Sequence, residues 1–186
     1  MEVLSLSMPE VKLIKPRRFK DDRGFFAQTY HEREYREAGI DVRFVQDNWS
    51  HSSRGVLRGL HYQLKNPQAK LVSVMRGEVF DVVVDVRRGS PTFGKWVSEI
   101  LSVENGHQLY VPVGFAHGFC VLSETVDFFY KCSDFYAPGD EYGIRWNDPA
   151  VKIDWPKCGE FILAEKDKGA PLLSDACVDV LPEFVA

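Results

Sequence analysis

Hydrophobic and polar residues alternate along most of the chain from residue 42 onward, and this alternation predicts β-strands. In the clearest case, Phe80 and the valines at 82, 84 and 86 share one face, while Asp81 and Asp85 lie on the other. Turn signals rich in Gly, Pro and Asn separate such segments. Many short strands between turns predict an antiparallel sandwich or barrel.

Helix is predicted in one place, over about residues 30–38. Thr29 followed three residues later by Glu32 matches a capping box, and Gly39 can end the helix. The segment 161–164 fits a short helix and a strand equally well.

The stretch 56–63 combines an apolar strand pattern with polar side chains. Strand alternation puts His61 and Gln63 on one face and Arg58 on the other. A histidine that faces the interior is either a core residue bonded through both nitrogens or a general base, because imidazole titrates near neutral pH.

Length and composition narrow the class of protein. The 186 residues favour a single domain spanning 1–186, and the net charge of −4 without a basic stripe argues against nucleic-acid binding. We see no signal peptide and no apolar run long enough for a membrane span. The four cysteines lack the spacing of a metal site, which favours reduced thiols. We therefore expect a cytoplasmic protein that does not contact a membrane.

Four residues are candidates for catalysis. His61, Lys70, His117 and Tyr130 each lie in or beside an apolar strand-like run. If they face one cavity, they supply a base, cationic or polar donors and a phenol. That set suits proton abstraction next to a carbonyl, with the enolate held by the donors.

A metal site is not expected. Pro112-x-Gly114-x-x-His117 is similar to the second metal-ligand motif of cupins. Metal cupins also use an earlier His-x-His segment, but here that segment reads His61-Tyr62-Gln63 and the second histidine is missing. We expect neither a metal nor another cofactor.

Seven motifs, in order along the chain, carry a specific resemblance: residues 22–26, 44–48, 57–63, 77–82, 90–94, 112–119 and 146–148. From about residue 5 to residue 175 the chain resembles the dTDP-4-dehydrorhamnose 3,5-epimerase family. The resemblance implies a cupin-type antiparallel jelly roll with a few short helices. It implies a homodimer in which N-terminal strands join the partner's sheet. It also implies metal-free conversion of dTDP-4-dehydro-6-deoxy-D-glucose to dTDP-4-dehydro-L-rhamnose, an isomerase step in making L-rhamnose for polysaccharides.

The resemblance also implies roles for single residues. His61 is the base, Asp167 orients it, Tyr130 is the acid on the other face, and Lys70 holds the enolate oxygen. Contacts to sugar or nucleotide are implied for Arg23, Gln28, Gln46, Asn48, Arg58, His117, Glu141 and Lys166. Gln28 stands where the family commonly has Glu, which loses a charge and leaves the number of inverted carbons and the nucleotide preference open.

Three alternatives remain at this point. The first is an epimerase that inverts only C3 or C5 of a related nucleotide sugar. The second is a metal-dependent cupin oxygenase or isomerase, against which the missing His-x-His motif speaks. The third is a cupin that binds sugar without catalysis, although such a protein has no need for His61, Asp167 and Tyr130 together.

Overall fold

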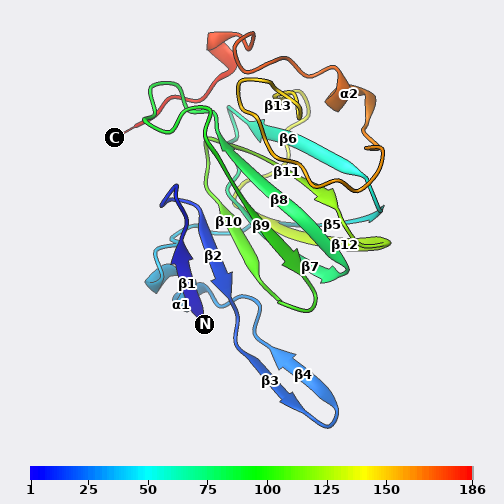
Figure 1. Ribbon diagram of the computed structural model, residues 1–186. Helices are drawn as coiled ribbons and strands as arrows, with labels where there is room; N and C mark the ends of the chain where they lie inside the picture. The colour runs from blue at the N-terminus through cyan, green and yellow to red at the C-terminus, as the bar shows by residue number, and fades with distance from the viewer. Residues whose placement is uncertain (186) are drawn as a thin grey trace.

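Two antiparallel β-sheets form the body of the protein in the computed structural model, which describes residues 1–185 (Figure 1). The six-stranded sheet has the order β1 (Glu2–Ser5), β2 (Lys12–Lys15), β10 (Gln108–Val111), β7 (Lys70–Arg76), β12 (Thr125–Cys132) and β5 (Gln46–Ser53). The five-stranded sheet has the order β13 (Glu141–Gly143), β6 (Leu57–Gln63), β11 (Phe115–Val121), β8 (Glu78–Asp85) and β9 (Trp96–Ser102). The antiparallel sandwich predicted from the alternation is confirmed.

The main hydrophobic core lies between the two sheets. Val72 and Phe128 from the six-stranded sheet pack there with Val83 and Phe119 from the five-stranded sheet. The five-stranded sheet is also covered on its outer face, where Val82 joins a second cluster with residues from the C-terminal third of the chain. Alternate residues of β8 therefore point into different clusters, as the period of two in segment 80–86 predicts.

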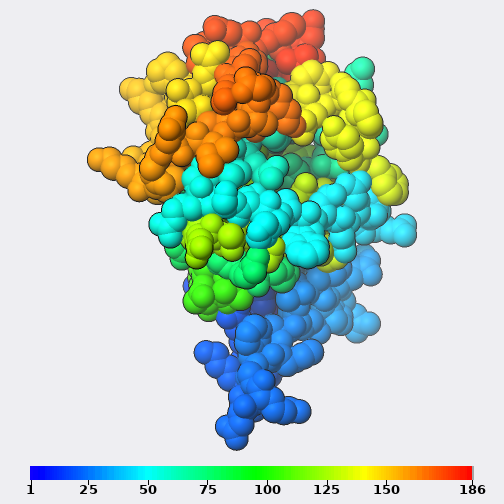
Figure 2. All heavy atoms as spheres, turned by 90° about the vertical axis from the view of Figure 1, so that its right-hand side faces the viewer, coloured from blue at the N-terminus to red at the C-terminus, as the bar shows by residue number. Residues whose placement is uncertain are grey.

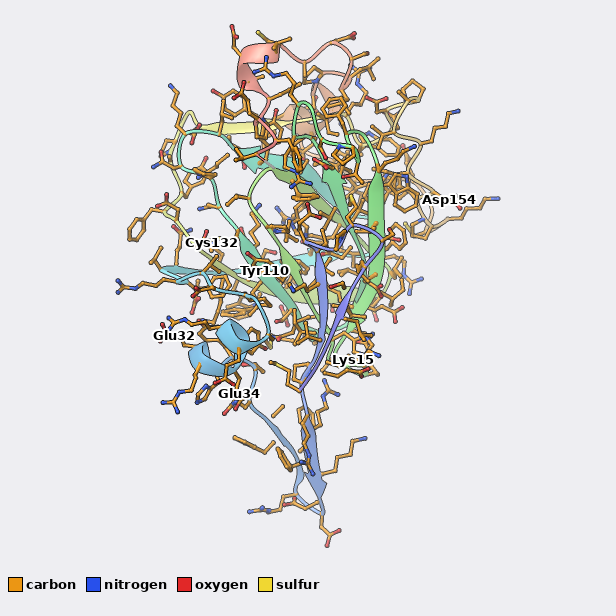
Figure 3. All side chains as sticks on the ribbon, turned by 90° about the vertical axis from the view of Figure 1, so that its left-hand side faces the viewer. Lys15, Glu32, Glu34, Tyr110, Cys132 and Asp154 are labelled. Carbon is orange, nitrogen blue, oxygen red and sulfur yellow. The ribbon has the colours of Figure 1, made fainter. Side chains whose placement is uncertain are left out.

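A third cluster covers the outer face of the six-stranded sheet. Helix α1 (Glu32–Glu37) contributes Tyr35 to it, against Leu71 and Tyr110. The outer side of α1 carries Glu32 and Glu34, both exposed (Figure 3). This part of the sheet is therefore buried on both faces.

Helix α1 confirms the predicted helix but not its cap. The N-cap is His31, whose side chain accepts from the Glu34 N–H, and not Thr29. The Thr29 carbonyl instead accepts hydrogen bonds from Tyr35 and Gln108, which holds Thr29 in the extended chain before the helix. Gly39 ends the helix as predicted, with a φ of +80° that glycine adopts readily.

The C-terminal third contains two short helical segments that the sequence pattern did not predict. Ile162 forms a bridge with Val56, so residues 161–164 run extended, and helix α2 (Glu165–Lys168) begins directly after them. A 3₁₀ turn, η1, spans Val178–Val180. None of the helices within residues 1–185 has the length and apolar character needed to cross a bilayer.

A two-stranded hairpin, β3 (Arg18–Asp21) and β4 (Gly24–Ala27), projects from the body as a narrow arm (Figures 1 and 2). It carries Phe19, Phe25 and Phe26, which are 50%, 54% and 68% exposed. Three exposed phenylalanines on one projecting arm form a patch of the kind that marks an interaction surface.

Candidate functional site

A cavity of about 500 Å³ opens between the two sheets. His61 and His117 reach it from β6 and β11 of the five-stranded sheet, whereas Lys70 and Tyr130 reach it from β7 and β12 of the six-stranded sheet. The four residues expected to share a cavity therefore do so. Most of the predicted site residues line it: Arg58, His61, Lys70, His117, Tyr130, Glu141, Lys166 and Asp167.

His61 and Asp167, far apart in the sequence, form a hydrogen-bonded pair. The distance from His61 Nε2 to Asp167 Oδ1 is 2.7 Å, and the Gly59 N–H donates to Asp167 Oδ2 at 3.3 Å. Burial raises the pKa of Asp167, but the hydrogen bonds from His61 and Gly59 lower it more, so the pKa lies below its ordinary value. An ionised Asp167 holds the proton of His61 on Nε2 and leaves the lone pair on Nδ1.

Tyr130 faces the cavity from the opposite sheet. Its register partners are Asn48 on β5 and Val72 on β7, and its ring packs partly against the main core. Burial raises the pKa of Tyr130 above its ordinary value, so the phenol keeps its proton at neutral pH. The cavity thus has a basic nitrogen on one wall and a proton donor on the other.

Lys70 supplies a cation to the same cavity. Burial lowers the pKa of Lys70 from its ordinary 10.5. Its ammonium makes no hydrogen bond or ion pair with another residue in the part of the chain that the structure describes. An ammonium held in this way is available to an oxyanion of a bound ligand.

Replacing Lys70 by methionine should stabilise the fold while lowering activity at least a hundredfold. The free energy of unfolding should rise by roughly 0.5–2 kcal/mol at pH 7, because a residue that is retained for function often makes the fold less stable than an alternative residue would. A lowered pKa means that the folded state binds the proton less tightly, so the charge costs stability at neutral pH. The stability difference should vanish as pH rises toward the unfolded value of 10.5. Thermal melts of both proteins between pH 7 and 10.5 measure this, and an unchanged or lower Tm for the variant at pH 7 would contradict it.

His117 pairs with Asp81, a residue that the sequence analysis did not select. His117 Nε2 lies 2.9 and 3.0 Å from the two carboxylate oxygens of Asp81, and both side chains are buried. Burial raises the pKa of Asp81 above its ordinary value, against the opposing influence of His117 and Lys70. The signal was present: an aspartate between Val79 and Val83 on the inner face of a strand needs a buried partner.

Arg58 lies on the same side as His61, so the predicted alternation is wrong at this point. The β6–β11 register shifts between His117 and Phe119, and residues 59 and 60 lie opposite the single residue Gly118. This is a β-bulge, and it turns both Arg58 and His61 toward the cavity. Arg58 also donates hydrogen bonds to the Ser52 hydroxyl.

Gly59 makes this bulge possible. Its φ is +118°, and a Cβ at this position would lie 2.6 Å from Gly118 Cα and 2.7 Å from the His117 carbonyl oxygen. Both neighbours are backbone atoms and cannot move aside alone.

Gly59→Ala should therefore lower the free energy of unfolding by roughly 2–5 kcal/mol through backbone conformation and steric overlap. It should also reduce activity, since the Gly59 N–H holds Asp167. Urea unfolding checks the first effect, with Gly139→Ala as control: that glycine also has positive φ, +85°, but no atom lies within 4 Å of its Cβ position. Equal losses in the two variants would show that the close approach contributes nothing.

A second hollow of about 350 Å³ continues from the first and shares His61, Lys70, Tyr130 and Glu141 with it. Gln46 and Asn48 line it, joined by a 3.0 Å hydrogen bond, and the Gln46 side chain also accepts from the Tyr136 N–H. These two predicted contact residues therefore lie in the same hollow as His61, Lys70 and Tyr130.

Arg23 and Gln28 are not brought to the cavity within one chain. Arg23 is in the turn of the β3–β4 hairpin, with its side chain 89% exposed and paired with Asp21. Gln28 directly follows β4 on the same arm. Neither lines the two hollows.

The cysteines form no disulfide bond in residues 1–185. All four cysteines are free, although Cys120 Sγ and Cys158 Sγ approach to 3.2 Å. Among residues 1–185, no three His, Cys, Asp or Glu side chains are grouped as ligands for a metal ion.

Comparison with known proteins gives consistent matches over the whole chain. The family model described as dTDP-4-dehydrorhamnose 3,5-epimerase matches residues 5–175. The chain is 56% identical over 177 residues to the dTDP-4-dehydrorhamnose 3,5-epimerase of Pseudomonas aeruginosa, covering 95% of this chain and 98% of the relative. A dTDP-4-dehydrorhamnose 3-epimerase of Streptomyces niveus is 41% identical, over 95% of this chain and 86% of the relative.

A solved structure matches equally well. A dTDP-6-deoxy-D-glucose-3,5-epimerase from Legionella pneumophila, crystallised in complex with dTDP-4-keto-L-rhamnose, superimposes with a TM-score of 0.97 at 50% identity. The match covers 100% of this chain and 99% of that one.

Proposed function

The chain belongs to the dTDP-4-dehydrorhamnose 3,5-epimerase family, and we propose that it converts dTDP-4-dehydro-6-deoxy-D-glucose to dTDP-4-dehydro-L-rhamnose by inverting C3 and C5. The protein is a cupin-type jelly roll and an isomerase. One observation supports the proposal for the site: His61, the proposed base, and Tyr130, the proposed acid, reach the same cavity from opposite sheets.

The reaction needs a base, an acid and a place for negative charge. The C4 ketone acidifies the hydrogens on C3 and C5. His61 Nδ1 removes one of them, and Asp167 stabilises the imidazolium that forms. Tyr130 then returns a proton from the opposite face, which inverts the carbon. We propose these roles because the pKa of Asp167 is lowered and that of Tyr130 is raised, so each starts in the required protonation state.

The enolate oxygen needs donors while the carbon has lost its proton. Lys70 offers an ammonium that has no partner among residues 1–185, and His117, held by Asp81, faces the same cavity from the opposite sheet. Preorganised donors of this kind stabilise charge as it develops. The remaining contacts to sugar or nucleotide are proposed for Arg58, Gln46, Asn48, Glu141 and Lys166, which line the two hollows.

We also propose a homodimer. Arg23 and Gln28 lie on the β3–β4 arm, outside the cavity of their own chain. The same arm exposes Phe19, Phe25 and Phe26, and a second copy offers an equivalent body for these rings to pack against. The arm could then carry Arg23 and Gln28 to the partner's nucleotide site.

Two further expectations accompany this proposal. The chain would act as a single domain spanning 1–186, since one core unites both sheets. It would work in the cytoplasm, where free thiols such as the close pair Cys120 and Cys158 stay reduced.

A second candidate is inversion at C3 alone, which is favoured by the 41% identity to the Streptomyces niveus 3-epimerase. The test is to incubate the purified protein with dTDP-4-dehydro-6-deoxy-D-glucose and assign the product by proton NMR. Inversion at both carbons supports the 3,5-epimerase, inversion at C3 alone supports the second candidate, and unchanged substrate would contradict both.

A further inference from the structure

Each inversion leaves the two reactive groups in the wrong protonation state. In the proposed function, on which this inference rests, His61 gains a proton and Tyr130 loses one. His61 must lose its proton, and Tyr130 must regain one, before the second carbon or the next substrate can react. The chain therefore needs a route by which the proton leaves His61.

The geometry around His61 defines where that proton arrives. Nε2 is occupied by the 2.7 Å hydrogen bond to Asp167, so the proton taken from the sugar binds to Nδ1. The carboxylate oxygen Oε1 of Glu141 lies 3.8 Å from Nδ1. Hydrogen bonds of catalytic groups are often long without substrate and shorten in the complex.

Glu141 lies beside His61 and is partly exposed to solvent. It begins β13, whose Gly143 is the register partner of His61 on β6, so the two strands are fixed to each other. Its side chain is 28% exposed and that of His61 is 23% exposed, compared with 3% for Asp167 on the other side of the ring. Of the two carboxylates beside the imidazole, Glu141 is therefore the one that can exchange a proton with solvent.

Lys166 holds Glu141 in this position. Its ammonium binds Glu141 Oε2, which leaves Oε1 directed toward His61. Lys166 therefore acts as a positioning residue that fixes which carboxylate oxygen of Glu141 faces His61.

We propose that Glu141 is the proton exit of His61. The Nδ1–H bond of the imidazolium breaks as an O–H bond forms on Glu141 Oε1, which restores neutral His61. Glu141 then gives this proton to water and becomes a carboxylate again. Tyr130, now a phenolate, takes a proton from water, so the solvent gains one proton and loses one for each inversion.

The variant Glu141→Gln tests the proposal because it keeps the shape of the side chain but cannot accept the proton. With enzyme in excess over substrate, loss of the first C–H should fall less than tenfold, a loss that reflects the substrate contact proposed for Glu141. Inversion at the second carbon and steady-state turnover should fall at least a further tenfold relative to that first step. Imidazole buffer should restore turnover in proportion to its concentration, since it replaces Glu141 as proton acceptor. Glu165→Gln, which removes an exposed carboxylate from α2, is the matched control and should behave as wild type.

Two outcomes would overturn the relay. If the first C–H loss falls as much as steady-state turnover, Glu141 acts on binding or on the chemical step. If turnover falls but imidazole does not restore it, Glu141 is not a proton acceptor. Failure of the proposed function is distinguishable, because the wild-type protein itself would then leave the substrate unchanged.

Discussion

His61→Ala should lower turnover by about a hundredfold to ten-thousandfold, the usual contribution of a general base. The variant should also lose exchange of the substrate hydrogens at C3 and C5 with solvent, since the proposed base has been removed. His117, the other imidazole there, is engaged by both oxygens of Asp81. Steady-state assays and NMR exchange in heavy water measure the two effects.

The fold should survive this change, because His61 faces a cavity and is not part of the hydrophobic clusters. His31→Ala is the matched control: that histidine is exposed at the N-cap of α1, so the variant should keep full activity and lose about 1 kcal/mol of stability. Near-normal turnover in folded His61→Ala would remove this residue from the mechanism.

Tyr130→Phe should separate proton removal from inversion. The base remains, so hydrogen at C3 or C5 should still exchange with solvent, but the proton should return from the side of His61. We expect inversion to fall by about a hundredfold to ten-thousandfold. Substrate recovered from heavy water should carry deuterium at the exchanging carbon while keeping its original configuration.

Tyr110→Phe is the control for this experiment. Tyr110 is also a buried phenol, but it lies in the cluster on the outer face of the six-stranded sheet (Figure 3). Its removal should leave inversion unchanged. Inversion at the wild-type rate in Tyr130→Phe would assign the acid to another group, and loss of exchange together with inversion would show that Tyr130 is needed to form the enolate.

The strands could be predicted from the sequence because the alternation of apolar and polar residues in a strand depends on which of its faces is covered. In β8 the alternation of valines with Asp81 and Asp85 follows from which side of the strand is covered, and this is a local property. The end of α1 at Gly39 was local in the same sense, whereas its cap was not. Thr29 is held out of the helix by Gln108, which is 79 residues away.

The site depends on contacts that no local pattern records. His61 and Asp167 are 106 residues apart, and only the resemblance to a family placed them together before the structure did. Arg58 was assigned to the wrong face because the bulge at Gly59 arises from a close approach to Gly118 on another strand. The strand alternation alone does not identify Asp81 as the partner of His117, because the contact joins β8 to β11.

The proposed two-group mechanism is tested most directly by the isotope content of the inverted product. The wild-type protein should be incubated with unlabelled dTDP-4-dehydro-6-deoxy-D-glucose in heavy water, and the product examined at C3 and C5 by NMR and mass. If His61 removes a proton on one face and Tyr130 returns another on the opposite face, each inverted carbon carries deuterium. An inverted carbon that retains its original hydrogen would mean that one group carries the same proton across, and this would contradict the account.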